Sequence, residues 1–231
     1  MTTHAPVVTI VDYEMGNLHS VQQACRHAGL TSMITASPAE VGAADGVILP
    51  GIGAMPHAVQ ALRASGMDDV LRRVAERGTP LFGICLGMQL LMEQGTEFGH
   101  HEGLGILPGS VVRFAEPREA GRVLKVPAIG WLGVTPAPQP DRSSPWSGTL
   151  LETTAPGEPF YFVHSYHVTP GDPSIALAMT AYGDAVYCSA VGRGNVFGCQ
   201  FHPERSGPAG LRVYDAFAAV VSRQREHGLG A

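Results

Sequence analysis

The sequence is poor in charged residues, in cysteine and in long hydrophobic runs, and these shortages exclude several classes of protein. Only 15% of the 231 residues are charged while 45% are hydrophobic, a balance that excludes an intrinsically disordered chain. The formal net charge of -5 gives no sign of a basic stripe for nucleic acid or of a polybasic membrane anchor. No apolar run approaches the roughly 20 residues of a transmembrane helix, and the amino terminus does not resemble a signal peptide. We therefore expect a cytoplasmic protein with neither a nucleic-acid partner nor a membrane partner.

Cysteine is scarce, and its spacing argues against a disulfide framework. The four cysteines form no CxxC pair and no regular pattern: Cys25, Cys85, Cys188 and Cys199. We expect all four thiols to be reduced.

The first 95 residues alternate between strand and helix patterns. Short, mostly apolar runs typical of buried strands occupy residues 7–13, 32–35, 46–49 and 80–84. Helical spacing or helix-capping residues occupy residues 17–28, 37–40, 54–64, 68–77 and 85–94. This alternation predicts a parallel sheet with helices on both faces.

The second half of the chain has a different character. From about residue 104 to 201 the sequence has short β-rich runs broken by glycine and proline. The most loop-like stretch is 136–145, and a last strand at 191–200 precedes a closing helix at 211–221. Because no internal repeat is present, we expect residues 1–231 to form a single domain.

Cys85 is the first candidate for chemistry. It lies between Gly83 and Gly87, where an apolar strand gives way to a helix. Such a turn can expose a nucleophile, and the start of a helix favours the thiolate. The backbone N–H of Leu86 would then point to where an oxyanion forms. The alternative is that Cys85 is a small buried hydrophobic residue, and this motif alone does not separate the two.

Two further segments carry groups that a thiol hydrolase needs. His202 and Glu204 flank one proline, and in an extended chain positions i and i+2 share a face. His202 could act as general acid and base, with Glu204 fixing its orientation. The alternative is a loop histidine beside a solvated acid.

Gly51, Ile52 and Gly53 follow a strand and could present backbone N–H groups to an oxyanion, although most such stretches are only turns.

Together these segments resemble class I (triad) glutamine amidotransferases over nearly the whole chain. Within that family the motifs are similar to those of the glutaminase subunits of imidazole glycerol phosphate synthase. The supporting segments are residues 11–18, 50–53, 83–89, 125–127 with 130–131, 161–166 and 200–207. The resemblance implies a flavodoxin-like, three-layer α/β/α fold with a mostly parallel sheet and a β-rich second half. It also implies a triad of Cys85, His202 and Glu204 that hydrolyses glutamine through a thioester.

The same resemblance implies roles for further residues. The oxyanion would be held by backbone of Gly51, Ile52, Gly53 and Leu86. Glutamine would be held by Gln89, His164, Ser165 and Tyr166. No cofactor and no metal is implied.

The resemblance also implies a partner. Ammonia would pass to a cyclase (synthase) subunit, a (β/α)8 barrel bound as a heterodimer, which converts PRFAR into imidazole glycerol phosphate and AICAR in histidine biosynthesis. The implied contacts with this subunit are Asn17, Trp131 and Arg205.

The chain departs from the pattern of that subunit at several positions. Glu14 stands where glycine is usual, and a positive φ there would cost a glutamate of order 1 kcal/mol. Ala128 and Leu132 replace a histidine and an asparagine, and Arg205 replaces a lysine. A related subunit that serves another amidation, a stand-alone γ-glutamyl cysteine hydrolase and a non-catalytic scaffold remain alternative interpretations.

Overall fold

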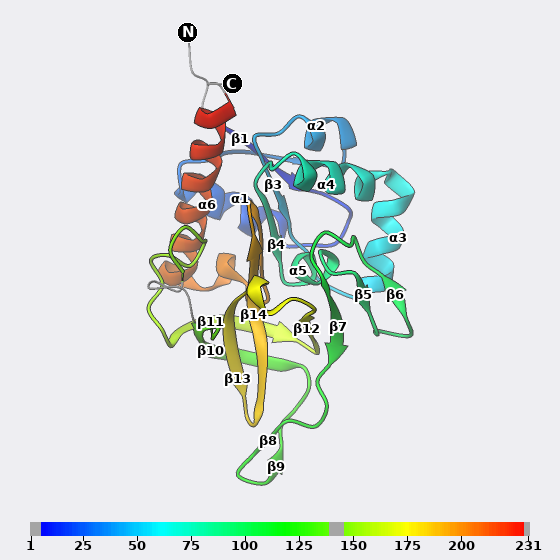
Figure 1. The fold of residues 1–231 in the computed structure, drawn as a ribbon, viewed down its shortest axis with the longest axis vertical. Helices are drawn as coiled ribbons and strands as arrows, with labels where there is room; N and C mark the ends of the chain where they lie inside the picture. Colours follow the sequence, from blue (N-terminus) through cyan, green and yellow to red (C-terminus); the bar gives the residue numbers. More distant parts are fainter. Residues whose placement is uncertain (1–5, 139–145, 229–231) are drawn as a thin grey trace.

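A computed structural model describes residues 6–138 and 146–228 (Figure 1). Of the loop predicted at 136–145, residues 139–145 lie outside the described residues, and Pro136 is the last residue of a strand. None of the helices in the described part of the chain combines the length and apolar character needed to cross a membrane.

Five parallel strands form one half of the main sheet, in the order β2-β1-β3-β4-β15. These are β1 (Val7–Val11), β2 (Thr31–Thr35), β3 (Gly46–Leu49), β4 (Leu81–Ile84) and β15 (Val196–Cys199). Every residue of β3, β4 and β15 is buried, as expected for strands covered on both faces. The prediction of a parallel sheet in the first half is confirmed.

Helices cover both faces of these strands (Figure 1). The helices are α1 (Leu18–His27), α2 (Pro38–Gly42), α3 (Met55–Ser65), α4 (Met67–Glu76), α5 (Leu86–Leu90) and α6 (Gly207–Gly228). One apolar cluster joins α1 and α6 to the sheet through Val21 and Phe217, among others. A second cluster joins α3 and α4 to the sheet through Leu62 and Leu71. The arrangement is a three-layer α/β/α fold.

The sheet continues beyond β15 through mostly antiparallel strands, in the order β14-β12-β7-β5-β6. Strands β10 and β13 branch from it, β11 pairs with β10, and the β8–β9 hairpin projects at the bottom of Figure 1. The strands are β5 (Gln94–Gly95), β6 (His101–Glu102), β7 (Gly109–Arg113), β8 (Arg118–Glu119), β9 (Arg122–Val123), β10 (Ala128–Pro136), β11 (Glu158–His164), β12 (Tyr166–Pro170), β13 (Ala176–Tyr182) and β14 (Ala185–Arg193). Two 3-10 helices complete the fold: η1 (Pro173–Ile175) and η2 (Pro203–Arg205).

Some element boundaries differ from the sequence prediction. The strand predicted at 191–200 is two antiparallel strands, β14 and β15, because Gly194 has a φ of +59° and reverses the chain. The helix predicted at 85–94 ends at Leu90, because the Leu90 carbonyl accepts the backbone N–H of Leu104 at 2.8 Å. The closing helix predicted at 211–221 is longer, from Gly207 to Gly228.

Candidate active site

Cys85 occupies a sharp turn between β4 and α5, with a φ of +54°. The glycines on either side make this turn possible. A Cβ on Gly83 would lie 2.7 Å from the backbone carbonyl carbon of Gly87, and one on Gly87 would lie 1.8 Å from the Leu49 carbonyl oxygen. The strained conformation of Cys85 is therefore held by close backbone packing that tolerates no side chain at either flank.

His202 and Glu204 form a buried pair. Nδ1 of His202 lies 2.8 Å from Oε1 of Glu204, and their side chains are 5% and 2% exposed. His202 has extended backbone, but Pro203–Arg205 form the 3-10 helix η2, so the extended segment predicted from the sequence stops at His202 and the two side chains meet across the start of this helix. The Ser206 hydroxyl fixes this segment to β11, because it donates to the His202 carbonyl at 2.7 Å and accepts the backbone N–H of Tyr161 at 3.0 Å.

The surroundings of His202 favour the charged imidazolium. Burial alone would lower the pKa of His202, but the neighbouring Cys85 and Glu204 oppose it through hydrogen bonding and charge and raise this pKa to about 10. Nε2 of His202 is buried and has no nitrogen or oxygen partner among the described residues. The side chain of Cys85 is the other neighbour, beside Glu204, that acts on this ring.

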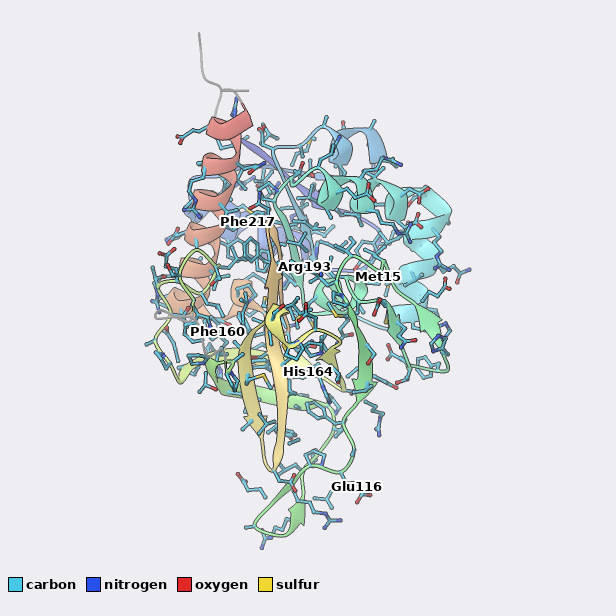
Figure 2. All side chains as sticks on the ribbon, in the orientation of Figure 1. Met15, Glu116, Phe160, His164, Arg193 and Phe217 are labelled. Atoms are coloured by element: carbon cyan, nitrogen blue, oxygen red, sulfur yellow. The ribbon has the colours of Figure 1, made fainter. Side chains whose placement is uncertain are left out.

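A cavity of about 290 Å³ opens beside the sulfur. It brings together most of the candidate residues from both halves of the sheet, and its lining consists of Ile52, Gly53, Cys85, Leu86, Gln89, Glu97, Pro127, Val163, His164, Ser165, Tyr166 and His202. Figure 2 shows one of them, His164, among the strands of the antiparallel half. The volume suits a small molecule of amino-acid size.

Gln89 and His164 share one acceptor in the cavity wall, the backbone carbonyl of Tyr166. Nε2 of Gln89 donates to this carbonyl at 2.9 Å, and Nδ1 of His164 lies 2.8 Å from it. Since a carbonyl only accepts, the proton of His164 belongs on Nδ1, and Nε2 accepts from the Tyr187 hydroxyl at 3.1 Å. Burial lowers the pKa of His164 to about 4 and keeps this ring neutral. Oε1 of Gln89 remains available to a ligand.

Sequence reasoning missed two polar groups of the site. Glu97 lines the cavity while its Oε2 accepts the backbone N–H of Met55 at 2.8 Å. Gln200 is fully buried beside the sulfur of Cys85. Glu97 lies between β5 and β6 without a motif to mark it, and only the tertiary fold brings it to the site. Gln200 adjoins the His202 segment in sequence, a proximity that could have drawn attention to it.

The remaining predicted residues are not part of the cavity lining. A Cβ on Gly51 would approach the Tyr13 hydroxyl oxygen to 2.3 Å, so Gly51 packs closely against Tyr13. Trp131 is 56% exposed on β10. Asn17 is the exposed residue that precedes α1. The Arg205 guanidinium lies 4.5 Å from the centre of the Tyr161 ring.

Glu14 has a positive φ, the conformation considered for this position because glycine is usual there. Its φ is +66°, a conformation that costs a non-glycine residue of order 1 kcal/mol. The backbone N–H of Glu14 donates to Oδ1 of Asp12 at 3.0 Å, which supports the turn.

A cysteine in a strand–helix turn, a buried His–Glu pair and a three-layer fold together are the features of a triad glutamine amidotransferase. The model of the family "Glutamine amidotransferase class-I" matches residues 9–219. The chain belongs to this family.

Three curated relatives are each named "Imidazole glycerol phosphate synthase subunit HisH". That of Syntrophotalea carbinolica is 44% identical, covering 91% of this chain and 98% of the relative. Those of Geobacillus thermodenitrificans and Rhodopirellula baltica are 42% and 43% identical, covering 96% and 93% of this chain and 99% and 98% of the relatives.

Solved structures share the fold at lower identity. A putative GMP synthase protein from Thermoplasma acidophilum superposes with a TM-score of 0.66 at 17% identity, covering 98% of both chains. PurLQS from Thermotoga maritima gives a TM-score of 0.67 at 17% identity, covering 93% of this chain and 98% of that one. The prediction of a class I amidotransferase fold is confirmed.

Proposed function

We propose that the chain is the glutaminase subunit of an imidazole glycerol phosphate synthase, acting in the cytoplasm as a single domain of residues 1–231. The observation that carries the proposal is the strained Cys85 beside the buried His202–Glu204 pair. The names of the relatives at 42–44% identity supply the enzyme of which the chain would be a subunit.

The first half-reaction would form a thioester. The Cys85 thiolate attacks the side-chain carbonyl carbon of glutamine, and the carbonyl electrons move to an oxyanion. The backbone N–H of Leu86 and the Gly51–Gly53 backbone stabilise this oxyanion. As it collapses, the C–N bond breaks and the nitrogen takes the proton of the His202 imidazolium. Ammonia leaves, and the glutamyl group remains on sulfur.

The second half-reaction would release glutamate. Neutral His202 takes a proton from water, whose oxygen attacks the thioester carbon. Collapse of the second oxyanion breaks the C–S bond and restores the thiolate beside a protonated His202, while the acid released ionises to glutamate. Glu204 holds Nδ1 of His202 throughout and so keeps Nε2 directed at the sulfur. These three side chains supply the nucleophile and every proton transfer, so the proposal includes no cofactor or metal.

The cavity offers complementary groups for the amino-acid end of glutamine. Oε1 of Gln89 and the Glu97 carboxylate can accept hydrogen bonds from the α-ammonium group. The neutral His164 with Ser165 and Tyr166 forms the opposite polar wall. We assign these residues to glutamine binding.

The partner would be the cyclase subunit, which is a (β/α)8 barrel bound as a heterodimer. Exposed residues near the site suit such a contact, because a tryptophan and an arginine are both typical of interface centres. We assign Asn17, Trp131 and Arg205 to this interface.

The deciding experiment is an assay of the purified chain with and without PRFAR and the cyclase subunit. We expect slow glutamine hydrolysis by the chain alone, strong stimulation by the partner with its ligand, and formation of imidazole glycerol phosphate. Cys85→Ala should abolish glutamine-dependent synthesis and spare ammonia-dependent synthesis.

Other outcomes of this assay would identify other functions. Rapid hydrolysis of γ-glutamyl peptides without a partner would overturn the proposed role as a subunit. Failure of a glutamine-analogue diazo-ketone to add one covalent mass at Cys85, with partner and ligand present, would indicate a scaffold. Loss of both activities in Cys85→Ala would assign Cys85 a structural role.

A further inference from the structure

Gln200 places a carboxamide against the sulfur of Cys85. It follows β15 directly and is 0% exposed. Its Nε2 donates to Sγ of Cys85 at 3.5 Å, a normal length for a hydrogen bond to sulfur. Gln200 is therefore a second neighbour of the nucleophile, in addition to His202.

The orientation of the Gln200 amide follows from its other contacts. Nε2 of Gln89 donates to the Tyr166 carbonyl, which can only accept, so the amide of Gln89 has one possible orientation. The same nitrogen donates to Oε1 of Gln200 at 3.0 Å. An inverted Gln200 would put two NH2 groups together and its oxygen against the sulfur. Nε2 of Gln200 is thus fixed as a donor to Cys85.

We propose that Gln200 is a catalytic residue whose amide N–H stabilises the Cys85 thiolate. Hydrogen bonds to a charged acceptor are about twice as strong as neutral ones, so this bond favours the thiolate over the thiol. It also holds the sulfur in place, because the amide is itself held by Gln89. The proposal rests on the assignment of Cys85 as the nucleophile.

Few other groups can act on the sulfur. Within residues 6–138 and 146–228, the charge of Cys85 acts on His202, on Tyr13 before α1, on Tyr187 of β14 and on Cys199 of β15. Burial raises the pKa of Tyr13, Tyr187 and Cys199, so these three stay neutral near pH 7. Of the described side chains beside the sulfur, His202 can carry a positive charge and Gln200 supplies a neutral N–H donor, and both stabilise a negative sulfur.

The test is the alkylation rate of Cys85 by iodoacetamide as a function of pH, with mass spectrometry to assign the site. This assay uses the free chain and needs neither glutamine nor the cyclase subunit. The other three cysteines lie in the apolar core and should react slowly. We compare the parent with Gln200→Met, which keeps similar bulk and removes the donor.

At pH 7 we expect Gln200→Met to lower the alkylation rate of Cys85 by about 10- to 100-fold, which corresponds to the free energy of a hydrogen bond to a charged group. Near pH 10 the rate of the variant should approach that of the parent. Ser189→Ala is the matched control. Ser189 is also 0% exposed and its carbonyl accepts the backbone N–H of Gln200, but its hydroxyl has no partner among the described residues. This control should retain the parent profile.

A folded Gln200→Met variant whose rate at pH 7 stays within twofold of the parent would overturn the proposal. If that variant does not fold, Gln89→Met replaces it, because it removes the group that fixes the Gln200 amide. Its alkylation rate at pH 7 should fall at least threefold, and an unchanged rate would overturn the proposal equally. Failure of the proposed function has a separate signature: the complex would not turn over glutamine, whatever the alkylation profiles show.

Discussion

Two histidines that line the same cavity, His164 and His202, are buried to nearly the same degree, at 6% and 4% exposure. Their charge states are opposite. Burial lowers the pKa of His164 to about 4, whereas Cys85 and Glu204 overcome burial and raise that of His202 to about 10. The partners explain the difference, since His164 meets a backbone carbonyl and a phenol while His202 meets a carboxylate and a thiol.

The comparison teaches that burial alone does not set the state of a histidine. A buried ring with two neutral partners is a fixed part of the wall, with one donor and one acceptor satisfied. A buried ring with a carboxylate on one side and a thiol on the other can hold and transfer a proton. Only the second kind suits the chemistry at Cys85.

Removing the charge of Glu204 would make His202 resemble His164 in its charge state, since both rings would then favour the neutral form. In Glu204→Gln the amide can still bond to Nδ1, but it no longer stabilises the imidazolium or enforces one tautomer. We expect glutamine-dependent turnover of the complex to fall by about 10³- to 10⁴-fold, as for the equivalent change in other triads. Steady-state assays with PRFAR measure this.

Ammonia-dependent synthesis by the same complex is the internal control and should not change. A loss below tenfold would mean that His202 does not depend on its carboxylate, and the contrast between the two histidines would lose its catalytic meaning.

The two histidines should also act at opposite ends of the pH range of stability. His202 has a folded pKa above the usual 6.5, so its contribution is complete below about pH 6.5 and is lost as pH rises towards 10. His164 has a folded pKa below 6.5, so its contribution is complete above about pH 6.5 and is lost as pH falls towards 4.

Urea unfolding between pH 4 and pH 10 measures both effects. His164→Gln should flatten the acid side of the stability profile, and Glu204→Gln should flatten the alkaline side. Flattening of the same side by both variants would contradict the assignment of opposite charge states.

The sequence predicts His202 and Cys85 far better than it predicts their surroundings. The turn at Cys85 is local, because Gly83 and Gly87 leave the space that it needs. The pairing of His202 with Glu204 is also local, because the two residues are only two positions apart, although Pro203 begins the 3-10 helix η2 there and the chain is not extended as predicted. The parallel first half was predicted from local strand and helix patterns, while the class and the three-layer fold were predicted from the family resemblance, and all three are confirmed.

Contacts between distant segments were not predicted. Glu97 reaches the cavity from a loop, and Gln200 meets Cys85 across 115 positions of sequence. The neutral state of His164 depends on the Tyr187 hydroxyl, 23 residues away on another strand. Such contacts depend on how the tertiary fold places β5, β11, β14 and β15 relative to one another, which no local pattern encodes.

A smaller effect, on stability alone, is expected from a substitution beside His164, the neutral histidine. Tyr187→Phe removes the hydroxyl that donates to Nε2 of His164 and leaves that nitrogen buried without a donor. The ring and its contacts with Phe114 and Phe162 remain. We expect a loss of about 1–3 kcal/mol in the free energy of unfolding by urea, the cost of a buried unsatisfied acceptor. Unchanged stability would show that His164 does not need this bond.

The smallest effect on stability, a gain rather than a loss, is expected from a substitution on β13, opposite Tyr187 on β14. Thr180 on β13 is the register partner of Tyr187 and is 1% exposed, yet its hydroxyl has no hydrogen-bond partner within residues 6–138 and 146–228. Thr180→Val keeps the shape and the β-branch and removes only an unsatisfied group. We expect the free energy of unfolding to stay constant or to rise by up to about 1 kcal/mol. Urea unfolding of Thr180→Val and Tyr187→Phe compares the removal of an unbonded hydroxyl with the removal of a hydrogen-bonded one, both of them buried. If Thr180→Val lost more than about 1 kcal/mol in the free energy of unfolding, burial of the hydroxyl rather than its hydrogen bond would set the loss of stability.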